Sequence, residues 1–481
     1  MDLQERIDQA RAIVGDTYRL AELKAAGFLP LTGDFAPCIH YPPSHRYPVA
    51  DEQALYSDFS LDPAVPLGVY LHIPFCLQRC VFCHFVTCTT PSDAEKDRYL
   101  DTLEREVDLF TSRFGFGRIK AKSVLVGGGT PTHLSPMQLG RFLAWFTSRF
   151  DLSSGPQISW DVDPLTLVGV DGWERLRMLR DSGVNRLTIG VQAFDDDLLR
   201  RMNRPHDTDT NYRAIEQARR AGFDDICVEL IYGYSGVDQR SWLETVSKAI
   251  SLGVEEIQQY RLKVIPYGSG KGLIGREYAE RADEFPSDEE AFAMKMASIL
   301  TLNDAGYHET LTRVFAKTPQ FRSQYTYDLC CNLDDMVGFG VTAYSVYGDR
   351  LCRNSRSFET YHRLVEEGKL PVGDGKIRTE DEQLRWALTL PLKNWKVARS
   401  RFTDLTGRAF DDVFRKKKEA LKRYGLINEL DKAIKLTEKG RFFADETCHQ
   451  FYHPDYMPFP QSEYADGPLN PYRDTEPFGE P

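Results

Sequence analysis

Between residues 67 and 262, short β-branched apolar runs alternate with longer amphipathic stretches. The runs predict strands at 68–73, 122–126, 157–161, 186–191, 225–231 and 255–262. The stretches between them predict helices at 93–113, 135–150, 172–182, 195–202, 208–221 and 239–251. Such alternation is typical of βαβ units, whose strands lie parallel in one sheet. The sequence therefore predicts an α/β fold with a partial, TIM-like (βα)6 barrel, and reactive groups at the carboxyl ends of its strands.

The remainder of the 481-residue chain divides into regions of different character. Residues 1–66 form a helical and Pro-rich extension before the barrel at 67–300, and 301–375 complete the barrel and lead out of it. Residues 376–450 predict a mainly helical, winged-helix-like domain, with helices at 380–391, 395–403 and 410–424 and a short β run at 433–436. The tail, 451–481, is rich in Pro, Tyr and acidic residues and is expected to wrap the surface or lack fixed structure.

The charge balance narrows the classes of partner. The chain has 60 Lys and Arg against 71 Asp and Glu, a net charge of −11, which argues against a nucleic-acid partner. No run of 18 apolar residues indicates a membrane span, and the charged first residues lack the layout of a secretory signal. We therefore expect a cytoplasmic protein that acts on a small molecule, with no membrane and no nucleic acid as partner.

Three of the ten cysteines, Cys76, Cys80 and Cys83, lie close together just after the first expected strand. Three thiolates on one loop can bind three irons of a 4Fe-4S cluster and leave the fourth iron open for a small chelating ligand. Tetrahedral zinc normally needs four ligands, and His84 is the adjacent candidate for the fourth. Spacing alone favours a cluster, while a zinc site and metal-free thiols stay open.

Further motifs follow in order, each at or just after an expected strand end. They are Tyr70-Leu-His72-Ile-Pro74-Phe75, Gly127-Gly128-Gly129-Thr130-Pro131, Asp161-Val-Asp163-Pro164, Gly190-Val-Gln192 continuing to Arg204, Glu229-Leu-Ile-Tyr232-Gly233, and Gly338-Phe339-Gly340. Together with the cysteines, this set resembles the radical S-adenosylmethionine (SAM) enzymes. Within them it is similar to the oxygen-independent coproporphyrinogen III dehydrogenase-like family. The resemblance covers about residues 68–345 and implies a radical SAM barrel.

The resemblance also implies roles for individual residues. Cys76, Cys80 and Cys83 would be the cluster ligands, and two SAM molecules would bind side by side. Glu229, Asp335 and Tyr344 are in addition candidate proton acceptors, which the sequence does not distinguish. At 263 and 344 the residue types differ from those of the family. The SAM contacts would come from Tyr70, Phe82, Gly128, Gly129, Thr130, Asp161, Gln192, Arg204, Glu229, Lys263 and Tyr344.

One departure bears on the reaction, because Phe85 stands where the coproporphyrinogen enzyme has a further cysteine. That difference, the long N-terminus and the aromatic tail favour the class C radical SAM methyltransferases and cyclopropanases. The predicted reaction is thus transfer of a methyl or methylene group from a second SAM to an sp2 carbon of a natural product. The alternatives are an oxygen-independent coproporphyrinogen III dehydrogenase, a heme-binding chaperone of the same family, and a zinc-stabilised binding protein.

Three further expectations concern the electron donor, a glycine-rich segment and two more cysteines. Reduction of the cluster implies an electron donor such as flavodoxin or ferredoxin. The glycine-rich segment 264–276 is either a lid over the site or an ordinary surface loop. Cys330 and Cys331 are expected to be buried thiols, with a second redox site as the alternative.

Overall fold

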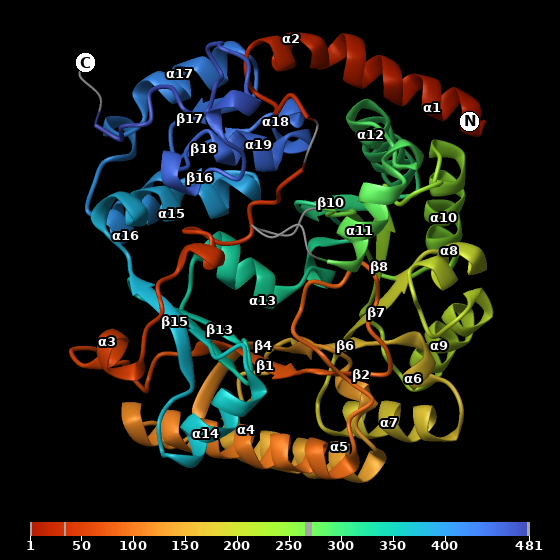
Figure 1. Ribbon diagram of the computed structural model, residues 1–481, viewed down its shortest axis with the longest axis vertical. Coiled ribbons are helices and arrows are strands. Elements are labelled where there is room, and N and C mark those ends of the chain that lie inside the picture. The colour runs from red at the N-terminus through yellow and green to blue at the C-terminus, as the bar shows by residue number, and fades with distance from the viewer. Residues whose placement is uncertain (1, 33–34, 265–271, 479–481) are drawn as a thin grey trace.

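A computed structural model describes residues 2–32, 35–264 and 272–478 of the chain. Its centre is a 13-stranded mixed sheet (Figure 1). Six parallel strands form the heart of this sheet in the spatial order β9-β8-β7-β6-β4-β1, and all six coincide with the strands expected from the sequence. They are β1 (Leu67–Ile73), β4 (Ile119–Gly128), β6 (Ile158–Val162), β7 (Arg186–Gln192), β8 (Ile226–Tyr232) and β9 (Glu256–Arg261).

Helices connect these strands and cover the outer face of the sheet (Figure 1). Serines at 92 and 135 accept hydrogen bonds from the first turns of α4 and α5, which explains where these two helices begin. Alternate strand residues such as Val124 and Val126 pack fully buried against the helices. The helices are α4 (Asp93–Phe114), α5 (Pro136–Arg149), α6 (Pro164–Leu167), α7 (Val170–Asp181), α8 (Asp196–Arg201), α9 (Thr208–Arg220) and α10 (Gln239–Ser251). The sequence thus predicted the α/β fold with its (βα)6 strand and helix pattern correctly.

Both ends of the sheet extend beyond what the sequence pattern indicated. Beyond β9 lie β11 (Val314–Ala316) and β10 (His308–Leu311), both antiparallel. Beyond β1 lies the parallel strand β12 (Met336–Phe339), followed by antiparallel β13 (Tyr344–Tyr347), β14 (Arg350–Asn354) and β15 (Val372–Ile377). Helix α12 (Asp288–Asp304) runs across the boundary expected at 300. This region also holds α11 (Leu273–Glu280), α13 (Gln324–Tyr327) and α14 (Phe358–Glu366).

The C-terminal region contains the elements expected of a winged-helix-like module, and it lies above the barrel in Figure 1. Its sheet has the order β16-β18-β17. The helices are α15 (Glu380–Lys393), α16 (Arg399–Thr406), α17 (Arg415–Arg423), α18 (Glu438–Phe442) and α19 (Ala444–His449), and the strands are β16 (Lys396–Ala398), β17 (Ile427–Leu430) and β18 (Ala433–Leu436). None of the helices in the described ranges is long and apolar enough to cross a membrane.

The N-terminal extension and the tail share one apolar core with this C-terminal region. Helices α1 (Leu3–Ala12) and α2 (Leu20–Ala25) lead to a descending segment, and α3 (Glu52–Tyr56) precedes the barrel (Figure 1). The tail pairs with the extension through a bridge between Pro30 and Tyr464, and Leu469 is fully buried. The described tail is therefore packed structure. Most of the possible lid at 264–276 lies outside the described residues.

Candidate active site

The cysteine loop leaves the carboxyl end of β1 and is clamped onto the turn that follows α8. The loop begins in β2 (Phe75–Cys76) and returns in β3 (Cys88–Thr89). Asn203 donates from Nδ2 to the carbonyl of Arg79 at 2.8 Å, and Gln78 donates back to the carbonyl of Asn203 at 2.9 Å. The three cysteines are each partly exposed. Their thiols are therefore held in place and remain accessible to a ligand.

The thiol set suits a cluster better than a single ion. Burial raises the pKa of Cys76 to about 12 and also raises that of Cys83, so both must lose protons when metal binds. Within the described ranges no three His, Cys, Asp or Glu side chains converge on one metal ion. His84, the candidate fourth zinc ligand, instead lies with Nε2 3.1 Å from the carbonyl of Lys263. A 4Fe-4S cluster takes each thiolate at a different iron and so accepts wider spacing.

The glycine run at the end of β4 passes directly beneath this loop. A Cβ on Gly127 would lie 2.2 Å from Oδ2 of Asp161, and one on Gly129 would lie 2.6 Å from the backbone of Pro74. Gly128 has a φ of +107°, which side chains rarely allow. The backbone amide of Thr130 donates to the carbonyl of Phe75 at 2.7 Å. Glycine is therefore needed here because strand and loop touch.

Two carboxylates lie near each other on the inner face of the barrel, and the buried Arg186 acts on both from a distance. Asp161 on β6 and Glu229 on β8 are partly exposed, and neither forms an ion pair within the described residues. Burial and the nearby Glu229 together raise the pKa of Asp161 to about 8, although Arg186 lowers it. Burial also raises the pKa of Glu229. A cationic ligand in this position would stabilise both carboxylates in their charged form.

Arg204, expected as a SAM contact, is held by protein groups in this structure. Its Nη2 donates to Asp163 Oδ2 and to the carbonyl of Gly190, both at 2.7 Å, and its Nη1 lies 3.1 Å from Cys80 Sγ. The guanidinium thus joins the barrel rim to the cysteine loop. Gln192, at the end of β7, is buried with a φ of +67°, a strained backbone at the same rim.

The remaining expected residues surround the same end of the barrel. Tyr70 lies on β1, and its hydroxyl is 2.9 Å from His72 Nδ1. Phe82 packs partly buried against an apolar cluster that includes Met202, which is compatible with loop packing as well as with a ligand contact. Burial lowers the pKa of Lys263, just beyond β9, to about 7.

Tyr344 lies inside the barrel with a residue that the sequence did not indicate. The carbonyl oxygen of Tyr344 lies 2.3 Å from the position that a Cβ on Gly338 would take. Gly338 pairs in register with Tyr70 of β1, which lies on the inner face. His40, from the N-terminal extension, stacks on the Tyr344 ring at 4.3 Å between centroids. Burial lowers the pKa of His40 to about 4, and the cations Lys393 and Arg353 lower it further. A neutral imidazole from a Pro-rich segment has no spacing signal that could have revealed it.

Comparison with known proteins agrees with this geometry. The family model described as "Radical SAM superfamily" matches residues 70–249, which include the cysteine loop, the glycine run and both inner carboxylates. Residues 70–249 thus match the radical SAM superfamily.

Relatives and a solved structure place this radical SAM protein more closely. It is 29% identical over 386 residues to the heme chaperone HemW of Bacillus subtilis, covering 80% of this chain and 98% of that protein. It is 27% identical over 419 residues to the oxygen-independent coproporphyrinogen III oxidase of Escherichia coli, covering 83% and 88%. The solved structure of coproporphyrinogen III oxidase (HemN) from E. coli superposes with a TM-score of 0.71 at 26% identity, covering 85% and 95%. The chain is thus HemN-like.

The superfamily match implies a 4Fe-4S cluster and SAM as the cofactors of this radical SAM protein. The residues present fit both groups. Three accessible thiols on one clamped loop would hold the cluster, and the two carboxylates beneath it would receive the cationic SAM.

The expected methyl transfer to a natural product is wrong. The relatives that match most of this radical SAM chain are named for coproporphyrinogen oxidation and for heme. The physical reason is that the motifs specify the radical-generating site, which the branches share. Chain length and an aromatic tail carry no information about the chemistry of the substrate.

Proposed function

We propose that this protein is an oxygen-independent oxidase of a coproporphyrinogen-type tetrapyrrole, which converts propionate side chains to vinyl groups. The observation that carries the proposal is the match to E. coli HemN over 95% of that chain. The radical SAM family model matches only residues 70–249, whereas the likeness to HemN covers 85% of this chain. The likeness therefore extends well beyond the region that generates the radical.

The chain's own residues have defined tasks in this reaction. When bound, the cluster and SAM supply a carbon radical able to take a hydrogen atom from a propionate chain. Loss of CO2 and of one electron then leaves the vinyl group, and the electron passes to an acceptor. Asp161 and Glu229 hold the cationic SAM, and Arg204 keeps Cys80 in place through its hydrogen bonds at the rim. The enclosing barrel excludes water from the radical.

Phe85 favours a second candidate, a heme chaperone. The dehydrogenase family has a cysteine at this position, whereas Phe85 is 60% exposed and cannot bind metal. The likeness to B. subtilis HemW, over 98% of that protein, supports the same alternative. In both cases we propose a reduced flavodoxin or ferredoxin as the source of electrons for the cluster.

Anaerobic assay of the reconstituted protein separates the two candidates. The protein is loaded with iron and sulfide, reduced, and incubated with coproporphyrinogen III and SAM. The oxidase produces protoporphyrinogen, CO2 and 5′-deoxyadenosine together, and the Cys76→Ala variant produces none. Tight heme binding with 5′-deoxyadenosine at the level of that variant would instead establish the chaperone and overturn the oxidase.

A further inference from the structure

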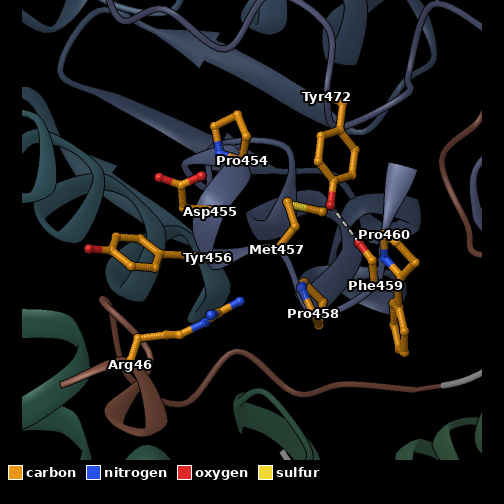
Figure 2. A pocket seen from close by; sticks show the side chains of 9 residues that line it. All are labelled: Arg46, Pro454, Asp455, Tyr456, Met457, Pro458, Phe459, Pro460 and Tyr472. Atoms are coloured by element: carbon orange, nitrogen blue, oxygen red, sulfur yellow. Dashed lines mark hydrogen bonds between the residues drawn. The ribbon is translucent and has the colours of Figure 1, made fainter. Parts of the chain in front are cut away.

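A cavity of about 700 Å3 lies outside the barrel, between the tail and the N-terminal extension (Figure 2). The turn at 454–460 forms most of its wall, and Tyr472 and Arg46 complete it. Its size is that of a site for a cofactor-sized molecule. No residue of the cavity belongs to the site described above.

The apolar part of the cavity wall is rigid. Prolines at 454, 458 and 460 restrict the backbone of the turn. Tyr472 donates from its hydroxyl to the carbonyl of Phe459 at 2.7 Å, the dashed line in Figure 2. Tyr456 is held from outside the cavity, because Lys376 donates to its hydroxyl at 3.0 Å and that hydroxyl donates to Glu382. A preformed wall of this kind contacts the edge of an apolar ring at low entropic cost.

Charge selects an anionic group on the ligand. Arg46 extends toward the cavity in Figure 2 and is exposed. Within the described ranges its guanidinium makes no hydrogen bond and no ion pair. The acid of the cavity, Asp455, lies 3.5 Å from His453. An arginine without a partner beside apolar walls suits a carboxylate, which it can bind through two parallel hydrogen bonds.

The segment that carries Arg46 also reaches the inner face of the barrel. The next residue, Tyr47, is buried, and its hydroxyl accepts a hydrogen bond from Tyr344. One short stretch of the extension thus connects the cavity with the candidate active site.

We propose that this cavity binds a tetrapyrrole macrocycle through the 454–460 turn and Tyr472, with a propionate on Arg46. The inference rests on the proposed function for the identity of the ligand. The macrocycle would be either the porphyrinogen substrate on its way to the barrel or a heme, since both combine a large apolar ring system with carboxylates.

Binding to the full-length, cluster-loaded protein tests the proposal under anaerobic conditions. Coproporphyrin III, the fluorescent oxidised analogue, and heme are titrated separately, and their affinities are measured by quenching and by absorbance. We expect Arg46→Glu to weaken binding of at least one of them about tenfold or more, because it replaces a charge-assisted pair by repulsion. Arg46→Lys should recover part of the loss. The control Arg240→Glu, on an exposed residue of α10, should change nothing.

The outcomes distinguish this inference from the proposed function. A loss confined to coproporphyrin III assigns the cavity to substrate, and a loss confined to heme assigns it to a heme. Unchanged affinity of folded Arg46→Glu for both compounds overturns the inference, even where the wild-type protein turns over coproporphyrinogen. Weakened binding in a protein whose wild type makes no protoporphyrinogen supports the cavity and overturns the oxidase function instead.

Discussion

Two layers of charged side chains lie inside the barrel, and only one of them contains a buried ion pair. In the lower layer Arg186 is 1% exposed and bonds to Glu256 at 2.5 Å, Ser159 at 2.6 Å and Thr188 at 2.8 Å. In the upper layer Asp161 and Glu229 lie near each other, and neither forms an ion pair within the described residues, although Arg186 of the lower layer lowers the pKa of both. The charges of the lower layer are therefore paired without a ligand, whereas the carboxylates of the upper layer gain an ion pair only when a cationic ligand binds.

A similar contrast occurs at the end of one strand. Asp161 lies on β6, and Asp163 follows directly after this strand as the N-cap of α6. Burial acts on both, yet Arg204 and His206 hold the pKa of Asp163 below its usual value, while the pKa of Asp161 rises to about 8. The residue type alone thus does not separate a structural carboxylate from a binding one, and the partner decides.

The cysteine loop above the upper layer gives the largest expected effect. Cys80→Ala removes one of three iron ligands, so cluster iron and 5′-deoxyadenosine formation should both fall to background. Iron and sulfide analysis with the electronic absorption of the cluster checks this. Cys88→Ala, a partly exposed cysteine in β3, is the matched control and should keep its cluster. Loss of iron in the control would show that the ligand set is different.

Breaking the ion pair of the lower layer should lower the stability of the folded protein, without a direct effect on ligand binding. Arg186→Met leaves the buried Glu256 without its cation, with Gln258 still donating to it at 2.7 Å, and should cost about 3–5 kcal/mol of unfolding free energy. Arg177→Met, on the exposed face of α7, should cost less than about 0.5 kcal/mol. Denaturant titration followed by circular dichroism measures both. An unchanged unfolding free energy of Arg186→Met would show that the ion pair of the lower layer does not stabilise the fold.

The upper layer should respond to pH through ligand affinity. With a pKa of about 8, Asp161 is protonated in the empty site at neutral pH and must release that proton when cationic SAM binds. Affinity for SAM should therefore increase as pH rises from 6 to 8, by at most about tenfold per unit, and then level off. Asp161→Asn should bind SAM weakly with a flat profile. Calorimetry in two buffers of different ionisation enthalpy detects the released proton, and no release would contradict the assignment.

The sequence predicted the parts of the fold that depend on local pattern. The six central strands alternate with amphipathic helices, and this periodicity needs no knowledge of the rest of the chain. The strands β12–β15 were not predicted because they are short and each pairs antiparallel with the next, so the spacing of βαβ units is absent there. The packing of the tail was not predicted either, because the tail is buried against the N-terminal extension, which lies hundreds of residues away in sequence.

For the site, motifs located the residues but not their partners. The cysteines, the glycine run and the inner carboxylates could be found from spacing. That Arg204 bonds to Asp163 and lies against Cys80 could not, because three separate segments meet there. His40 reaches the barrel only through the path of the Pro-rich extension. The predicted reaction was wrong because the motifs specify the radical-generating site that the branches share, and carry no information about the substrate.

A third kind of buried carboxyl sharpens the comparison and gives the smallest expected effect. Glu106 on α4 has no cation, but it accepts hydrogen bonds from Gly340 N at 2.8 Å and from Tyr361 and Asn354 at 2.6 Å. Burial raises its pKa from 4.5 to about 7 in spite of them. The folded state therefore holds this proton more tightly than the unfolded state, and the resulting stability is complete below pH 4.5 and lost as pH rises to 7.

Glu106→Gln cannot titrate and should remove this pH dependence. Relative to the variant, wild-type protein should lose roughly 1–2 kcal/mol of unfolding free energy between pH 5 and pH 8. Denaturant titrations at both pH values measure the difference, with Glu216→Gln on the exposed side of α9 as the control. Unlike that of Asp161, this dependence should persist at saturating SAM, because Glu106 bonds to the turn at Gly340 and not to ligand. Suppression by SAM would mean that the ligand site extends to that turn.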